Sequence, residues 1–126
     1  MTATLSHRKE LCFWGWGYAD EGLTEDEEAH LGRVAQGMGA VATRASAPVL
    51  DVFALPAPRI TPSAAVAGFL SATPYDRITH GYGKSFADLV RLQMREMTNP
   101  PDWVAFPKNE DDLGELIGFA DATGAA

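Results

Sequence analysis

Apolar residues recur at helical spacing in several parts of the chain, and two of these parts open with a capping box. Thr24 and Glu27 form the first capping box, which predicts a helix over residues 25–38. Ser85 has the same relation to an aspartate three positions later, which predicts a helix over residues 86–96. The expected apolar face of the first helix comprises Leu31, Val34, Ala35 and Met38. The acidic residues of its first turn are stabilised by the helix dipole and require no catalytic role.

The last part of the chain has the pattern of a strand, a turn and a helix. Residues 103–106 form a continuous apolar run between prolines, which predicts a strand buried on both faces. Asn109 then caps a helix that Gly124 is expected to close. The expected inner face of this helix comprises Leu113, Leu116, Ile117 and Ala120. Such a unit normally returns to a second, parallel strand beside the first.

The sequence stops where that second strand is expected to begin. A buried strand without a neighbour leaves backbone groups unpaired. We therefore expect the chain to be the truncated front end of a longer protein.

The middle of the chain is expected to be mostly extended. Residues 40–60 contain several prolines and no sustained period, which predicts a connector with a short strand near residues 49–53. Thr61 followed by Pro62 predicts a short alanine-rich helix that ends near Leu70. We expect this small helix to be buried.

An aromatic strip, CFWGWGY, occupies residues 12–18. Gly15 and Gly17 disfavour a helix, whereas the aromatic side chains carry a large apolar area that needs a surface to cover. Two interpretations of aromatic residues 13–18 are open, namely packing onto the core of the longer parent protein and docking at a membrane surface. Packing is favoured over membrane contact, because Asp20, Glu21 and the acidic helix that follows would be repelled by anionic lipid.

Composition excludes several classes of protein. The 46% hydrophobic and 21% charged residues are typical of a soluble globular protein, and the net charge of −7 disfavours a nucleic-acid partner. Cys12 is the only cysteine, which excludes an intrachain disulfide and fits a reducing cytoplasm. No stretch reaches the ~18 apolar residues that span a bilayer, and the first residues lack the apolar core of a secretory signal. We expect a cytoplasmic protein.

Few side chains form a pattern that is typical of a catalytic or ligand-binding site. His7, His30 and His80 lie far apart in the sequence and form no metal-ligand pattern. The segment HGYGKS around Lys84 has the wrong spacing for a phosphate-binding loop and is expected to be a turn before the helix that Ser85 caps. No residue is therefore assigned as catalytic, cofactor-binding or metal-ligating.

Residues 76–124 resemble the segment that leads into the FAD-binding domain of vanillyl-alcohol-oxidase-like flavoenzymes. Within that superfamily they are most similar to the alkylglycerone-phosphate synthases and their bacterial FAD-linked oxidase relatives. The residues that carry this resemblance are Arg77, His80, Gly81, the stretch 85–91, Pro101, Asp102, Val104 and Pro107. The early WGWG of residues 14–17 is also similar to the opening of that subgroup.

The resemblance implies an α+β, in part α/β, chain with two regions. Residues 1–98 would be a mostly helical N-terminal extension, and residues 99–126 would begin a PCMH-type FAD-binding domain. The parent would be a flavin-dependent oxidoreductase or a synthase of ether lipids, and the partner of this segment would be the rest of that enzyme. Family members hold the flavin pyrophosphate on a glycine-rich loop after the next strand. FAD is therefore expected in the parent and not on this segment alone, which would be inactive.

The roles of Arg77 and His80 in such a parent are open, since either could contact flavin or substrate. From the residues alone, Arg77 is expected to anchor backbone carbonyls, with an ion pair to Asp76 or to an acid outside this segment as the alternative. His80 is expected to be a hydrogen-bonded structural residue beside a glycine turn. A second hypothesis is a small, self-contained, non-enzymatic binding module that holds its partner with residues 13–18.

Overall fold

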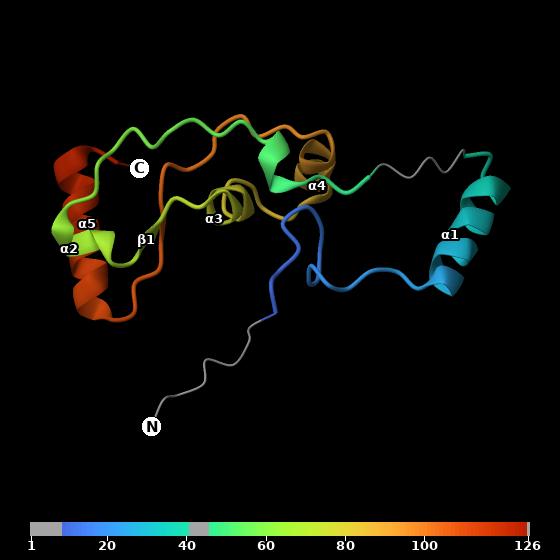
Figure 1. Cartoon of the computed structure of the whole chain (residues 1–126), viewed down its shortest axis with the longest axis horizontal. Helices are drawn as coiled ribbons and strands as arrows, with labels where there is room; N and C mark the ends of the chain where they lie inside the picture. Colours follow the sequence, from blue (N-terminus) through green and yellow to red (C-terminus); the bar gives the residue numbers. More distant parts are fainter. Residues whose placement is uncertain (1–8, 41–45, 126) are drawn as a thin grey trace, which may run out of the picture.

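The computed structural model describes residues 9–40 and 46–125, which form a mixed α and β structure (Figure 1). The elements in chain order are α1 (Glu25–Gly37), the 3-10 turn η1 (Leu50–Val52), α2 (Ala64–Ala67), β1 (Leu70–Ser71), α3 (Pro74–Thr79), α4 (Phe86–Gln93), β2 (Val104–Ala105) and α5 (Glu110–Thr123). The predictions for residues 1–8 with His7, for connector residues 41–45 and for residue 126 lie outside the described residues.

The capping boxes predicted from the sequence are present at α1 and α4. The Thr24 hydroxyl oxygen accepts the Glu27 N–H at 3.3 Å, and the Thr24 N–H donates to the Glu27 carboxylate at 2.8 Å. The same reciprocal pair forms at the start of α4. That helix ends at Gln93, three residues before the predicted end, because the chain turns into the left-handed region at Arg95, where φ is 63°.

The middle of the chain differs from the prediction. Residues 50–52 form η1 instead of a strand, since the Phe53 N–H bonds the carbonyl three residues back at 3.1 Å. The helix predicted from Pro62 to about Leu70 is only the four-residue α2, which starts after Ser63, and Leu70 belongs to β1. Within α2 only one side chain, that of Val66, is buried.

α3 was not predicted, although its start carries the expected signals. The Thr73 hydroxyl accepts the N–H of Asp76 at 3.2 Å, and Pro74 occupies the first helical position. The helix has only six residues, which is too short for a periodic apolar pattern to reveal it.

The two strands pair antiparallel, with Leu70 opposite Ala105 and Ser71 opposite Val104. One further bond, from the Phe106 N–H to the Phe69 carbonyl at 2.8 Å, extends the pairing. The prediction of a strand at residues 103–106 buried on both faces is therefore only partly correct. Val104 is buried, but Phe106 is 46% exposed, because a two-stranded sheet is too small to cover both faces of β2.

The hydrophobic core is small and lies between α3, α4 and η1. Phe53, Ile78 and Leu92 form its buried centre. Phe13 and Trp14 of the aromatic strip pack against this centre, and the Phe13 ring meets the Phe53 ring edge-on at 6.1 Å between centroids. These two residues therefore contact the core of this chain itself, and packing of the strip onto the core of a longer parent protein stays a prediction.

Much apolar surface remains in contact with solvent. α1 has no buried residue, and Figure 1 shows it apart from the other helices. α5 has no buried residue either, and the predicted inner-face residues Leu113 and Ile117 are 46% and 61% exposed.

Candidate functional site

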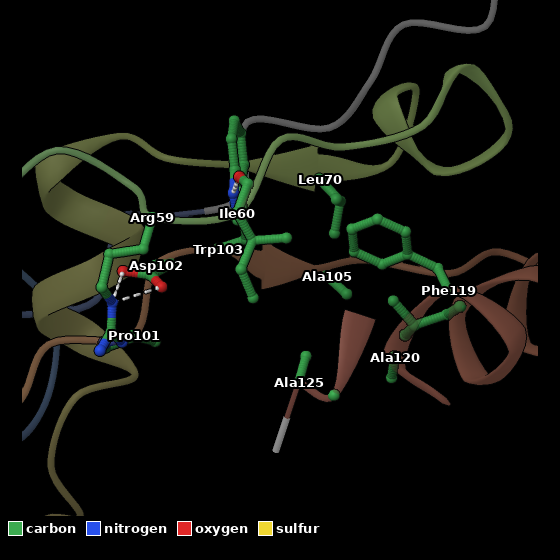
Figure 2. Close-up of a pocket in the computed structure, with 12 residues that line it drawn as sticks. Arg59, Ile60, Leu70, Pro101, Asp102, Trp103, Ala105, Phe119, Ala120 and Ala125 are labelled. Carbon is green, nitrogen blue, oxygen red and sulfur yellow. Dashed lines mark hydrogen bonds and ion pairs between the residues drawn. The ribbon is translucent and has the colours of Figure 1, made fainter. Parts of the chain in front are cut away.

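The candidate site is a groove between the small sheet and α5, with a volume of about 640 Å³ (Figure 2). Its lining is mostly apolar and comes from β1, β2, α5 and the loops that precede α2 and β2. The lining residues are Arg59, Ile60, Leu70, Pro101, Asp102, Trp103, Ala105, Leu116, Phe119, Ala120, Gly124 and Ala125. The helix thus presents Leu116, Phe119 and Ala120 to the groove, which corrects the predicted inner face that included Leu113 and Ile117.

Two contacts hold the loop before α2 against the loop before β2. The Trp103 indole N–H donates to the Ile60 carbonyl at 2.8 Å. The Arg59 Nε donates to both carboxylate oxygens of Asp102, at 3.2 and 3.0 Å. Asp102 is largely covered, with 10% of its side chain exposed, whereas 80% of the Arg59 side chain is exposed. The charged pair at the groove is therefore neutral overall.

The end of α5 directs the chain into the groove. Gly124 closes the helix with a left-handed φ of 65°, as the sequence predicted. The next N–H, that of Ala125, bonds the Ala120 carbonyl at 3.0 Å, so the backbone folds back along the last turn. As a result both Gly124 and Ala125 line the groove.

One edge of β2 carries no strand within the part of the chain that the structure describes. β1 is the partner on the other edge, and the described sheet has two strands. Open strand edges present unpaired N–H and C=O groups that accept a further strand. The groove therefore combines an apolar lining with a free set of backbone hydrogen-bonding groups.

Arg77 lies outside the groove and fastens two distant segments. Its side chain is buried, its Nε donates to the Pro101 carbonyl at 2.7 Å, and its Nη1 donates to the Pro56 carbonyl at 2.8 Å. This agrees with the prediction that Arg77 anchors backbone carbonyls. The remaining nitrogen, Nη2, has no hydrogen-bond partner in the described residues.

His80 and Gly81 also have structural roles. The His80 Nδ1 lies 2.8 Å from the Asp76 carbonyl, and its ring stands edge-on to Phe106 at 5.8 Å. A Cβ on Gly81 would lie 2.7 Å from the Met97 sulfur and 3.1 Å from the Arg77 carbonyl, so a side chain does not fit there without movement. His80 is therefore a hydrogen-bonded residue beside a glycine that the packing requires, as predicted.

Lys84 has a role that sequence reasoning missed. Its ammonium donates to the carbonyls of Cys12 at 2.7 Å, Phe13 at 3.3 Å and Gly15 at 3.1 Å. The Trp16 indole N–H returns a bond to the Lys84 carbonyl at 3.0 Å. No local signal reveals a contact between residues so far apart in the sequence, which is why Lys84 was assigned only to a turn.

Desolvation shifts the pKa values of two groups around the aromatic strip. Partial burial beneath the strip lowers the pKa of Lys84 below its usual 10.5. Partial burial likewise raises the pKa of Tyr75 above 10.0, and the Tyr75 hydroxyl donates to the Leu11 carbonyl at 2.9 Å. Both groups act as links between the strip and the helices beneath it.

The described residues provide little else for chemistry. Residues 9–40 and 46–125 contain no group of three or more side chains arranged to hold a metal ion. None of the described helices combines the length and the apolarity that crossing a bilayer requires. What the geometry offers is an apolar groove beside an open strand edge.

About a third of the chain is similar to two alkyldihydroxyacetonephosphate synthases. The enzyme of Dictyostelium discoideum is 36% identical over 44 residues, which are 35% of this chain and 7% of that protein. The enzyme of Trypanosoma brucei brucei is 39% identical over 46 residues, which are 36% of this chain and 8% of that protein. The matched region thus spans less than a tenth of either relative. No protein-family model and no solved structure matches the chain.

Proposed function

We propose that the chain is the N-terminal part of an FAD-dependent enzyme of the alkylglycerone-phosphate-synthase kind, in which it supplies structure and not catalytic groups. The observation that carries this proposal is the groove beside the open edge of β2. The groove has the place and the lining that a third strand, parallel to β2 and following α5, would require. The two synthases that the chain resembles supply the class of enzyme.

The geometry at the end of α5 supports a return of the chain beside β2. Gly124 turns the backbone at the groove, and Ala125 already forms part of the lining. A crossover from one strand through a helix to a parallel neighbour is right-handed in nearly all proteins and places the new strand under the helix. A strand in that position would pair the open edge of β2 and cover Phe119 and Leu116.

The described residues do not fit FAD by themselves. A dinucleotide needs clustered backbone donors or cations for its pyrophosphate. The only cation that lines the groove, Arg59, is paired with Asp102. The first turn of α5 carries Glu110, Asp111 and Asp112, which would repel phosphate from that helix end. The flavin would therefore be held by other parts of the enzyme, and no chemical step is assigned to this chain.

The reaction of the whole enzyme follows from the resemblance alone. Two reactions fit that resemblance, namely exchange of an acyl for an alkyl group on dihydroxyacetone phosphate and oxidation of a hydroxy-acid-like substrate. The names of the two similar proteins favour the first. The described groove favours neither reaction, because it lacks an anion-binding group for a phosphorylated substrate.

A pair of alanines on α5 provides a matched test in a longer protein that contains these residues. Ala120 lines the groove, whereas Ala122 on the same helix is exposed and does not. Ala120→Trp would fill the space of the third strand, and overpacking of this kind destabilises by about 1–3 kcal/mol. We expect the purified Ala120→Trp protein to retain less than about half of the wild-type flavin, and Ala122→Trp to retain all of it. The measurement is flavin absorbance per mole of protein.

The reading frame beyond residue 126 gives the decisive result. The proposal expects a short apolar strand followed by a glycine-rich loop. A stop codon directly after residue 126, or a longer protein that binds no flavin, would contradict it.

A self-contained binding module is the second candidate, and the exposure of Trp16 favours it. Trp16 is 67% exposed and Tyr18 is 38% exposed, so these two residues of the strip remain accessible to a partner. Phe13 and Trp14 are committed to the core. A sharp thermal transition of the 126-residue chain, together with absence of flavin in the longer reading frame, would favour this candidate.

A further inference from the structure

Two helices carry apolar stripes whose side chains remain exposed in the described part of the chain. On α1 the stripe consists of Leu31, Val34 and Met38, which are 51%, 44% and 73% exposed. On α4 the stripe consists of Phe86, Val90 and Met94 at its C-cap, which are 77%, 39% and 63% exposed. Figure 1 shows the helices α1 and α4 apart from each other.

The two stripes match in length. Leu31 and Met38 are seven residues apart, which corresponds to about 10.5 Å along a helix. Phe86 and Met94 are eight residues apart, which corresponds to about 12 Å. Helices with apolar positions at such spacing pack along their length, and an antiparallel arrangement would place Leu31 near Met94 and Met38 near Phe86.

The charges at the ends of α1 and α4 favour the antiparallel arrangement. The first turn of α1 carries four acidic residues, Glu25, Asp26, Glu27 and Glu28. The far end of α4 carries Arg91 in its last turn and Arg95 just beyond it. In the described residues the Arg95 guanidinium bonds only neutral oxygens, namely the Gln93 carbonyl and the Ser46 hydroxyl. An antiparallel pair would bring the acidic end of α1 to this basic end and oppose the two helix dipoles.

We propose that the apolar stripe of α1 packs antiparallel on the stripe of α4 in a second copy of this chain, and that the two copies exchange their α1 helices symmetrically. A helix of 13 residues without tertiary contacts is marginal in water, so α1 gains its stability from this contact. The proposal is independent of the flavoenzyme function.

The area that a symmetric pair of contacts buries is sufficient for an interface between two copies. Six side chains that each expose on the order of 100 Å² would bury about 600 Å² in one contact and about 1,200 Å² in the two contacts of a symmetric dimer. The larger figure reaches the lower bound of stable protein interfaces, whereas one contact alone stays below it. The dimer is therefore expected to be specific but weak.

Sedimentation velocity of the 126-residue chain over about a hundredfold range of concentration around the micromolar region tests the proposal. Wild type is expected to pass from monomer to dimer. Val34→Glu on α1 and Val90→Glu on α4 are each expected to raise the dissociation constant by at least about tenfold, because each places a charge in the contact. Both positions are exposed, so the variants are expected to fold, which circular dichroism checks.

A mixture of the two variants identifies the surfaces that meet. The Val34→Glu chain retains an intact α4, and the Val90→Glu chain retains an intact α1, so a mixed dimer has one undamaged contact. The mixture is expected to associate more strongly than either variant alone and more weakly than wild type. Pairing of α1 with α1, or of α4 with α4, would show no such recovery and would overturn the proposal.

Ile117→Glu is the matched control, because Ile117 is 61% exposed but belongs to neither stripe. It is expected to leave the dimer unchanged, and loss of dimer in this variant would locate the interface on α5 and overturn the proposal. A chain that is monomeric at every concentration would also overturn it. A monomer in which Val90→Glu removes amide-exchange protection from α1 would overturn it as well, since that result would show that α1 packs on α4 of its own chain.

Discussion

At the scale of single residues, Arg77 shows how one side chain holds two segments in place. Its guanidinium joins the carbonyls of Pro56 and Pro101, which precede α2 and β2 respectively. It thereby fixes the two loops that border the groove. The cost of burying a cation is offset by these charged hydrogen bonds, each of which contributes about 1.5–3 kcal/mol.

Removal of this guanidinium should therefore be costly. We expect Arg77→Met to lower the free energy of unfolding by about 3 kcal/mol, because two part-buried hydrogen bonds from a charged donor are lost. Urea denaturation followed by circular dichroism measures the change. The control is Arg33→Met, since Arg33 is exposed on α1. Equal stability of the two variants would show that Arg77 does not fasten the loops.

Lys84 makes stability depend on pH in the alkaline range. Its pKa is lower in the folded chain than the usual 10.5, because burial disfavours the ammonium. Below the pKa of Lys84 in the folded chain, Lys84 is protonated in both the folded and the unfolded chain. The folded chain then bears the full cost of desolvating the ammonium. As pH rises through the folded pKa towards 10.5, the folded chain loses its proton first, so the contribution of Lys84 to stability increases.

Tyr75 opposes this trend, because its raised pKa makes the folded chain retain a proton as pH rises above 10.0. The Tyr75→Phe background separates the two effects. In that background we expect unfolding free energy to rise between neutral pH and about pH 10, and the rise to disappear after Lys84→Gln. An unchanged pH profile after Lys84→Gln would contradict the assignment.

At the scale of elements, cap residues were the most informative part of the sequence. Thr24, Ser85 and Asn109 marked the starts of α1, α4 and α5, because a side chain that satisfies free N–H groups acts within three residues. The helix α3 has the same kind of cap at Thr73 and could have been found from it. The strand β1 could not, since its pairing with β2 depends on residues 33 and 35 positions away.

The candidate site was predictable only in part. The sequence placed β2, the α5 cap and Gly124, because their signals are local. It did not reveal the groove, since the Arg59–Asp102 and Trp103–Ile60 contacts join residues 43 positions apart. The face of α5 that lines the groove was also partly misassigned. The apolar positions of that helix extend around more than one side, so periodicity alone does not select the groove-lining face.

Alanine substitutions at two glycines are expected to change stability in opposite directions. At Gly114 in α5 a Cβ would meet nothing within 4 Å, whereas at Gly81 it would meet the Met97 sulfur at 2.7 Å. We expect Gly114→Ala to raise the thermal midpoint, because alanine is favoured over glycine in a helix by about 1 kcal/mol. Gly81→Ala is expected to lower the midpoint. Differential scanning calorimetry measures both, and a rise in both variants would contradict the packing described at Gly81.

At the scale of the whole molecule, apolar surface is abundant and the buried core is small. Phe53, Ile78 and Leu92 form the buried centre, while large side chains on α1, α4 and α5 contact solvent. This distribution is typical of a polypeptide that completes its packing against something else. The third strand proposed at the groove and the α1 exchange proposed between copies would cover different parts of this surface.

The boundary predicted at residue 98 stays a prediction, and contacts between helices and strands cross it. β1 pairs with β2, and α2 packs against α5. Residues on both sides of the boundary therefore line the groove. A division into an extension and the start of a cofactor domain is compatible with this only if the two parts fold against each other.

The ammonium of Lys84 ties the beginning of the described chain to its centre. Its three acceptors lie 72, 71 and 69 positions earlier in the sequence. Any shortened version that starts after Gly15 would lose all three of these hydrogen bonds, and with them the contacts of Phe13 and Trp14 with the buried centre. Trimming the chain at its front is therefore expected to weaken the packing of its middle, even though the strip looks dispensable as a peripheral loop.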